Sequence, residues 1–109
     1  MRVSPRNSLP HIGLGDWTEQ EVIELRRVQS ALERVGIATN TNFGLSDEGD
    51  PWCAICRIES VEVLAHFARI GGTYIGYSEG LKCGRRGDNL HDVSDYFLNR
   101  LNTTTRTYS

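Results

Sequence analysis

The chain has too little of several features to belong to some common classes of protein. Its 109 residues include three cysteines, an odd and small number that argues against a framework of disulfides. No stretch approaches the ~18 consecutive apolar residues that a membrane helix needs. The first residues, "MRVSPRNSLPHIGLG", lack the apolar centre of a signal peptide. We therefore expect a cytoplasmic protein whose cysteines are reduced thiols.

An excess of charge of one sign is also missing. Twelve basic residues stand against 14 acidic ones, so no overall positive field attracts nucleic acid or an anionic membrane. The length suits a single domain, which we expect at residues 16–102. Residues 1–15 contain two of the prolines and no apolar period, and they predict a flexible arm. The polar residues 103–109 predict a disordered tail.

An amphipathic pattern begins at "DWTEQEVIELRRVQSALERVGI" and predicts a helix over residues 16–36. Asp16 or Thr18 is the expected N-cap, because each has a glutamate three positions on that can close a capping box. The apolar face of this helix consists of Val22, Leu25, Leu32 and Val35. That face can pack on the protein's own sheet, or it can form the seam of a homodimer.

Three apolar runs, at residues 52–58, 61–70 and 73–78, predict the strands of an antiparallel meander. The Gly71-Gly72 pair suits a two-residue turn between the second and third strands. A helix is the alternative for the middle run, since Ser60 can cap it. We favour the strand, because the valines and the phenylalanine of this run suit a pleated surface.

Two stretches between these elements predict loops, because they are dense in glycine and short polar residues. They are "ATNTNFGLSDEGDP" and "SEGLKCGRRG". A second amphipathic helix, "DNLHDVSDYFLNRLN", follows, with Asp88 or Asn89 as its cap. The predicted fold class is α+β, in the order α-β-β-β-α, with a small three-stranded antiparallel sheet packed with two amphipathic helices.

Residues 52–56 read "WCAIC" and have the outline of a redox-active C-x-x-C motif. Such a motif needs a helix amino terminus or a nearby cation to lower the pKa of a thiol. Here both cysteines lie inside a predicted strand, where side chains three apart point to opposite faces. We therefore interpret Cys53 and Cys56 as apolar filling, and thiol-redox chemistry is an alternative function.

A metal site and a catalytic site both lack a complete pattern. The residues that could hold zinc are Cys53, Cys56, Cys83 and His66. The first two have the spacing of a zinc knuckle, but a second C-x-x-C is missing. His91 and Asp95 lie four apart on a predicted helix, a spacing typical of a surface ion pair. We expect no cofactor, no metal and no enzymatic activity, with zinc binding as an alternative.

Six residues are candidates for contact with a partner, three of them basic and three aromatic. They are Lys82, Arg85, Arg86, Trp52, Tyr74 and Tyr77. The basic residues lie in the predicted loop at residues 82–86 and can contact phosphate, but no recognised nucleic-acid motif accompanies them. The aromatic residues are candidate anchors for another protein, since such residues dominate interface energetics.

Residues 44–69, "GLSDEGDPWCAICRIESVEVLAHFAR", resemble a segment of uncharacterised bacterial proteins in which a DEGDPW turn precedes a short β-meander. In that pattern bulky apolar residues occupy the positions of Cys53 and Ala54, which implies that Cys53 need not be a reactive thiol. The resemblance implies that the acidic turn and the sheet belong together, and it carries no assigned activity.

The sequence as a whole favours a small cytoplasmic bacterial protein that acts by binding another macromolecule. We expect an interaction or regulatory protein whose partner is another protein. The alternatives are a thiol-redox or zinc-binding protein that uses Cys53 and Cys56, and a weak nucleic-acid binder that uses the basic residues at 82–86.

Overall fold

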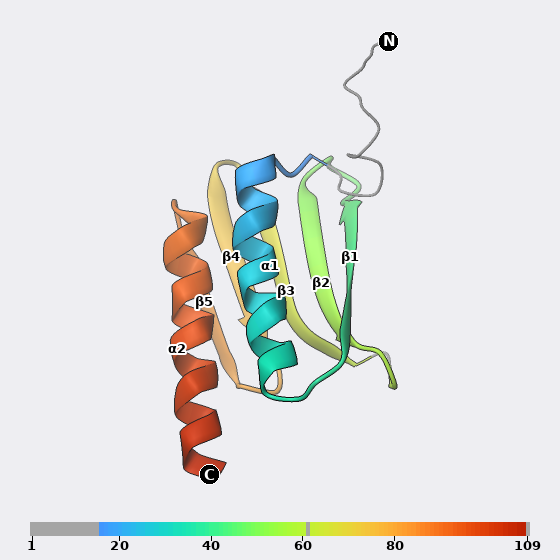
Figure 1. Cartoon of the computed structure of the whole chain (residues 1–109). Coiled ribbons are helices and arrows are strands. Elements are labelled where there is room, and N and C mark those ends of the chain that lie inside the picture. Colours follow the sequence, from blue (N-terminus) through green and yellow to red (C-terminus); the bar gives the residue numbers. More distant parts are fainter. Residues whose placement is uncertain (1–15, 61, 109) are drawn as a thin grey trace.

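The computed structural model of the chain describes residues 16–60 and 62–108, with residues 102–108 described by their backbone alone. The predicted arm at residues 1–15 lies outside the described residues. Two helices and five strands follow one another along the chain (Figure 1). They are α1 (Glu19–Arg34), β1 (Thr39–Leu45), β2 (Pro51–Arg57), β3 (Val63–Ile70), β4 (Thr73–Ser78), β5 (Cys83–Gly87) and α2 (Leu90–Tyr108).

The five strands form one sheet in the order of the chain, and each neighbouring pair is antiparallel. The α+β class and the antiparallel meander are confirmed, and the middle run is a strand, not a helix. The predicted number of three strands is wrong. The edge strands β1 and β5 lie within the two stretches predicted as loops, and β5 takes up residues 83–86 of the predicted basic loop at 82–86. Their glycines and short polar residues favour turns locally, but pairing with β2 and β4 holds the backbone extended.

Tight turns join the strands. Gly71 and Gly72 have φ angles of 56° and 81°, the positive values that the predicted two-residue turn requires. Between β1 and β2, the hydroxyl of Ser46 accepts a hydrogen bond from the N–H of Asp50 at 3.1 Å, and Gly49 has a φ of 89°. The acidic turn therefore connects two paired strands of the sheet.

The first helix begins with a capping box. The hydroxyl of Thr18 accepts the N–H of Glu21, and the carboxylate of Glu21 accepts the N–H of Thr18. Thr18, not Asp16, is therefore the N-cap. At the start of α2, the side chain of Asn89 accepts the N–H of Asp92 at 3.3 Å. This helix runs to Tyr108, past the predicted end of the domain at residue 102.

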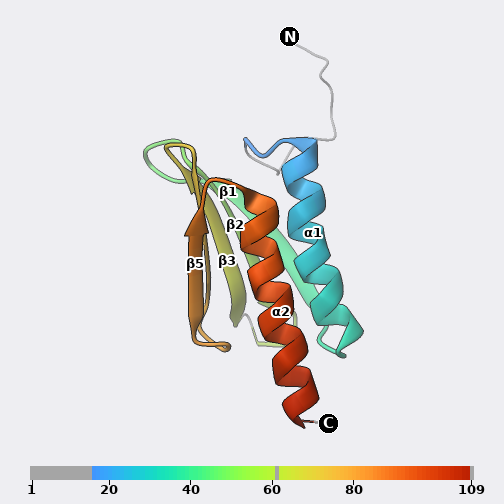
Figure 2. The same cartoon turned by 90° about the vertical axis from the view of Figure 1, so that its left-hand side faces the viewer.

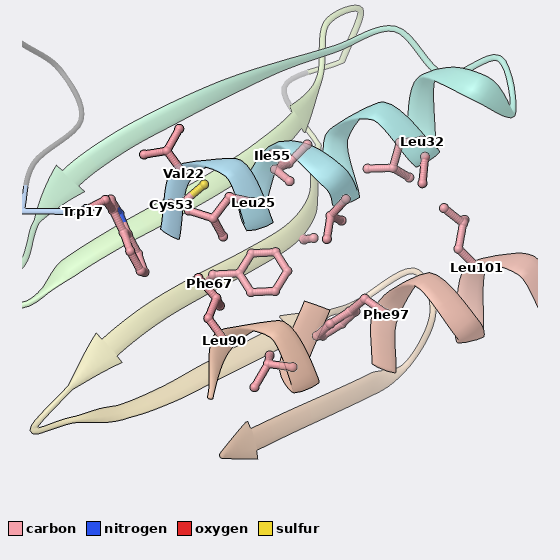
Figure 3. Close-up of a cluster of buried hydrophobic side chains, with 14 of the residues drawn as sticks. Trp17, Val22, Leu25, Leu32, Cys53, Ile55, Phe67, Leu90, Phe97 and Leu101 are labelled. Atoms are coloured by element: carbon pink, nitrogen blue, oxygen red, sulfur yellow. The ribbon is translucent and has the colours of Figure 1, made fainter. Parts of the chain in front are cut away.

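Both helices lie side by side on the same face of the sheet (Figure 2). The hydrophobic core fills the layer between helices and sheet (Figure 3). Its largest rings, Phe67 of β3 and Phe97 of α2, meet edge to face with centroids 5.2 Å apart. Gly76 permits this contact, because a Cβ at that position would lie 2.6 Å from Phe97 and 2.9 Å from Phe67.

The apolar face of α1 packs within its own chain. Val22, Leu25 and Leu32 are buried in the core, so they are not available for the seam of a homodimer, while Val35 stays partly exposed. Within the described part of the chain, neither helix is long and apolar enough to cross a membrane.

Candidate functional site

Alternation along the strands gives the sheet two different faces. Cys53, Ile55 and Phe67 are fully buried under the helices, so the residues between them point to the opposite side, which we call the open face. Carried through the strand register, the open face consists of Asn40, Asn42, Gly44, Trp52, Ala54, Cys56, Val63, His66, Ala68, Ile70, Thr73, Ile75, Tyr77, Gly84 and Arg86. Within this set Arg86 is the one permanently charged side chain.

Trp52 is the most firmly held aromatic side chain of the open face. Its backbone carbonyl accepts the indole N–H of Trp17 at 3.1 Å. Its ring lies across Gly44 of β1, where a Cβ would come within 2.4 Å of it. On the other side the ring stacks on His66, with centroids 6.2 Å apart and planes 20° apart. Burial lowers the pKa of His66, which favours the neutral imidazole in this stack.

The other two predicted aromatic anchors lie on opposite faces of β4. Tyr77 is on the open face, 49% exposed, and its hydroxyl donates to Glu79 at 2.8 Å. Tyr74 points to the helices, and its hydroxyl donates to the carboxylate of Glu21. Tyr74 therefore contributes to the protein's own packing, and only Trp52 and Tyr77 share the open face.

The predicted basic patch is divided in the same way. Lys82 lies in the turn before β5, with a φ of 54°. Arg85 points toward α2, with its guanidinium 5.3 Å from the ring centroid of Tyr96. Arg86 pairs with Ile75 and lies on the open face. The three cations therefore do not form one contiguous surface.

The cysteines and His66 are split between the two faces. Cys53 is fully buried on the helix side, and burial raises the pKa of its thiol to about 12. Cys83 is also buried in the core. Cys56 lies on the open face, where its sulfur is 3.7 Å from the side-chain nitrogen of Asn42. The four residues of the zinc alternative therefore cannot meet at one point, and no other metal-binding group of three occurs among the described residues.

A buried carboxylate links α1 to the sheet. Glu21 accepts two hydrogen bonds from Arg69, at 2.6 and 2.7 Å, and one from Tyr74. Burial alone would raise the pKa of Glu21, but the hydrogen bonds from Tyr74, Thr18 and Arg69 outweigh it and lower the pKa. The guanidinium of Arg69 also lies 5.6 Å from the ring centroid of Trp17. This cluster holds the helix in place.

A second polar cluster links α1 to α2. Glu24 accepts the hydroxyl proton of Ser94 at 2.9 Å and pairs with Arg27 at 2.5 Å and His91 at 3.1 Å. The predicted pair of His91 and Asp95 is present at 3.2 Å. Ser94 is fully buried and bonded to a carboxylate, so it is not placed to act as a nucleophile. The cluster binds the two helices together.

Sequence reasoning missed both buried carboxylates. Glu21 and Glu24 read as solvent-exposed acids of an amphipathic helix. Their burial could have been suspected from their position beside Val22 and Leu25, at the border of the apolar face of the helix. A charged side chain can be buried at such a border when it has a partner.

A pocket of about 460 Å³ opens between the C-terminal half of α1 and the middle of α2, with the sheet as its floor. Its walls include Val28 and Leu32 of α1, Ala65 of β3, and Phe97 and Leu101 of α2. Figure 3 shows Leu32 and Leu101 projecting toward each other from the two helices. No sequence pattern predicts this pocket, because its walls come from segments far apart in the chain.

No protein-family model, curated protein or solved structure matches the chain. Among the described residues the geometry of the molecule offers two features suited to binding, the open face and the pocket between the helices.

Proposed function

We propose that the chain acts by binding another protein through the open face of its sheet. The observation that carries the proposal is the contrast between a helix-covered face and a face that keeps large apolar side chains exposed. Val63 is 44% exposed and Tyr77 49%, and the stack of Trp52 on His66 lies beside them on the same sheet. An exposed apolar and aromatic surface of this kind is typical of an interaction site.

The open face is already arranged for binding. The ring of Trp52 lies against Gly44 and stacks on His66, so little side-chain freedom is lost when a partner covers it. Tyr77 offers an apolar ring and a hydroxyl, a combination that interfaces use often. These two residues are the expected anchors.

The charge of the open face favours a protein over a nucleic acid. Arg86 is its one guanidinium, whereas Lys82 and Arg85 lie off the face. Nucleic-acid binding depends on several cations that neutralise phosphates together. A mostly neutral apolar surface matches the core of a protein interface instead.

The proposal includes no catalytic step, as the sequence analysis expected. It retains the cytoplasmic location expected from the sequence. It also retains a bacterial origin, which the resemblance of residues 44–69 implies.

Site-specific photo-crosslinking in the native host tests the proposal. A benzophenone amino acid replaces Tyr77 on the open face, and the matched control replaces Ile23 on the outer side of α1, which is 54% exposed. We expect one crosslinked protein at position 77 and none at position 23. We also expect Trp52→Ala to reduce its yield about tenfold or more, as loss of a central aromatic anchor does.

Two results would contradict the proposal. One is an equal pattern of crosslinks at both positions, which would mark them as random collisions. The other is a crosslink at position 77 that nuclease removes, which would support the nucleic-acid alternative. A thermal melt of each variant confirms that the protein is folded before its crosslinks are compared.

A further inference from the structure

The pocket between the helices has the size and the walls of a small-molecule site. Its volume of about 460 Å³ lies in the range typical of ligand pockets. The inner wall is made of buried side chains, among them Val28, Ala65 and Phe97. The hydroxyl of Ser78 is the one polar side chain of this buried wall among the described residues.

An apolar wall of this kind favours a hydrocarbon ligand over water. Protein interiors are close-packed, so an unfilled apolar space loses dispersion contacts on every side. Water gains few hydrogen bonds there, because an ordered water needs two to four polar partners. An apolar chain inserted between Leu32 and Leu101 would restore the missing contacts.

The mouth of the pocket differs from the wall, because it is exposed and charged. Arg57 and Glu62 both line it, and Glu62 accepts the Nε–H of Arg57 at 3.1 Å. That bond occupies one of the five donors of the guanidinium. The remaining donors suit the two oxygens of a carboxylate.

A further cation lies near the same rim. Leu81 lines the pocket, and Arg100 donates to the carbonyl of Leu81 at 3.4 Å. Among the described lining residues Glu62 is the one carboxylate. Arg57 and Arg100 against the single carboxylate of Glu62 favour a negatively charged head group.

We propose that this pocket binds a single-chain amphipathic anion of the fatty-acid class. The hydrocarbon tail lies between the two helices, and the carboxylate lies at the rim beside Arg57. The site is separate from the open face, since the sheet stands between them, and it does not depend on the protein-binding function proposed above.

Calorimetric titration of the full chain tests the proposal with probes that share one tail. Dodecanoate, dodecanol and dodecyltrimethylammonium are each titrated below their micelle concentration. We expect dodecanoate to bind about tenfold more tightly than dodecanol, the effect of one charge-assisted hydrogen bond. We expect the cation to bind more weakly than both. Undetectable binding of dodecanoate, or equal binding of the cation, overturns the proposal.

Variants of the wall and the rim locate the site. Ala65→Leu fills the pocket, so it should weaken dodecanoate binding at least tenfold while it raises the Tm of the ligand-free protein by a few degrees. A variant that is more stable and yet binds less cannot be explained by misfolding. Ala68→Leu is the matched control, because it lies on the same strand and faces the other side.

The rim is tested by Arg57→Gln. We expect it to weaken dodecanoate binding about tenfold and to leave dodecanol binding unchanged, since only the carboxylate uses the guanidinium. The methyl ester of dodecanoate should behave like dodecanol, which distinguishes a free fatty acid from an esterified lipid. Unchanged dodecanoate binding in both Ala65→Leu and Arg57→Gln would place the ligand elsewhere and overturn the proposal.

Discussion

The two faces of the sheet are built from the same strands but have different surroundings. In β3, Phe67 is fully buried under the helices, while its neighbours His66 and Ala68 point to the open face. Two helices cover the first face, where Glu21 bonds α1 to the sheet and Glu24 bonds α1 to α2. The second face is therefore not needed to hold the helices, and it leaves Tyr77 exposed.

The largest difference between the faces should appear on truncation of a ring. Phe67→Ala removes a fully buried ring and should lower the free energy of unfolding by ~3–5 kcal/mol, as large-to-small substitutions in cores do. Tyr77→Ala, on the open face, should lower it by less than ~1 kcal/mol. Chemical denaturation measures both. Equal losses would show that the open face is part of the stabilising core.

The next difference concerns glycines. Gly76→Ala places a methyl group against Phe67 and Phe97 and should cost ~1–3 kcal/mol, the usual effect of overpacking. Gly80→Ala is the control, because a Cβ there meets nothing within 4 Å and the backbone has no positive φ. We expect that control to be neutral or slightly stabilising. A neutral Gly76→Ala would mean that the two rings can move apart at little cost.

The anchoring carboxylates should make the helix-covered face sensitive to acid. The pKa of Glu21 is lowered in the folded protein, so its contribution to stability is present above about pH 4.5, the ordinary value, and is lost as the pH falls through the lowered pKa. Glu21→Gln should therefore cost ~1–2 kcal/mol at pH 7 and less at pH 3. Denaturation curves at both pH values check this, with exposed Glu19→Gln as the control. A loss that is the same at both pH values would contradict the assignment.

The smallest expected effect distinguishes the two histidines. The hydrogen bond and charge of Glu24, with the charge of Asp95, raise the pKa of His91, whereas burial lowers that of His66. Titration followed by NMR should therefore show His91 protonated at a higher pH than His66. Glu24→Gln should move the pKa of His91 back toward 6.5 and leave His66 unchanged. The reverse order of the two pKa values would mean that the helix cluster or the Trp52 stack does not form.

Local signals predicted the parts of the fold that depend on a few neighbouring residues. The capping box at Thr18, the turn at Gly71-Gly72 and the start of a strand at Pro51 all follow from contacts within about four positions. The prediction failed for β1 and β5. In β1 the alternation of Thr39, Thr41 and Phe43 toward the core was a weak strand signal, hidden by asparagines and a glycine that favour turns.

The candidate site was predicted only in part. Trp52 and Tyr77 were identified as anchors, and both lie on the open face. Tyr74 and Arg85 were identified with equal reason, but strand register turns them toward the helices. A one-residue change in register would exchange the two faces of a strand. No property of the individual residues could therefore show that Trp52 and Tyr77 lie on the open face while Tyr74 and Arg85 do not.

By itself the sequence determined the α+β class, the two amphipathic helices and the location of Cys53 and Cys56 in a strand. These features follow from the spacing of apolar residues, which repeats every three to four positions in a helix and every two in a strand. Only the tertiary structure decided that both helices share one face, that Glu21 and Glu24 are buried with partners, and that a pocket opens beside Leu32. These features join segments that lie tens of residues apart. Their formation depends on packing between elements, which no local pattern encodes.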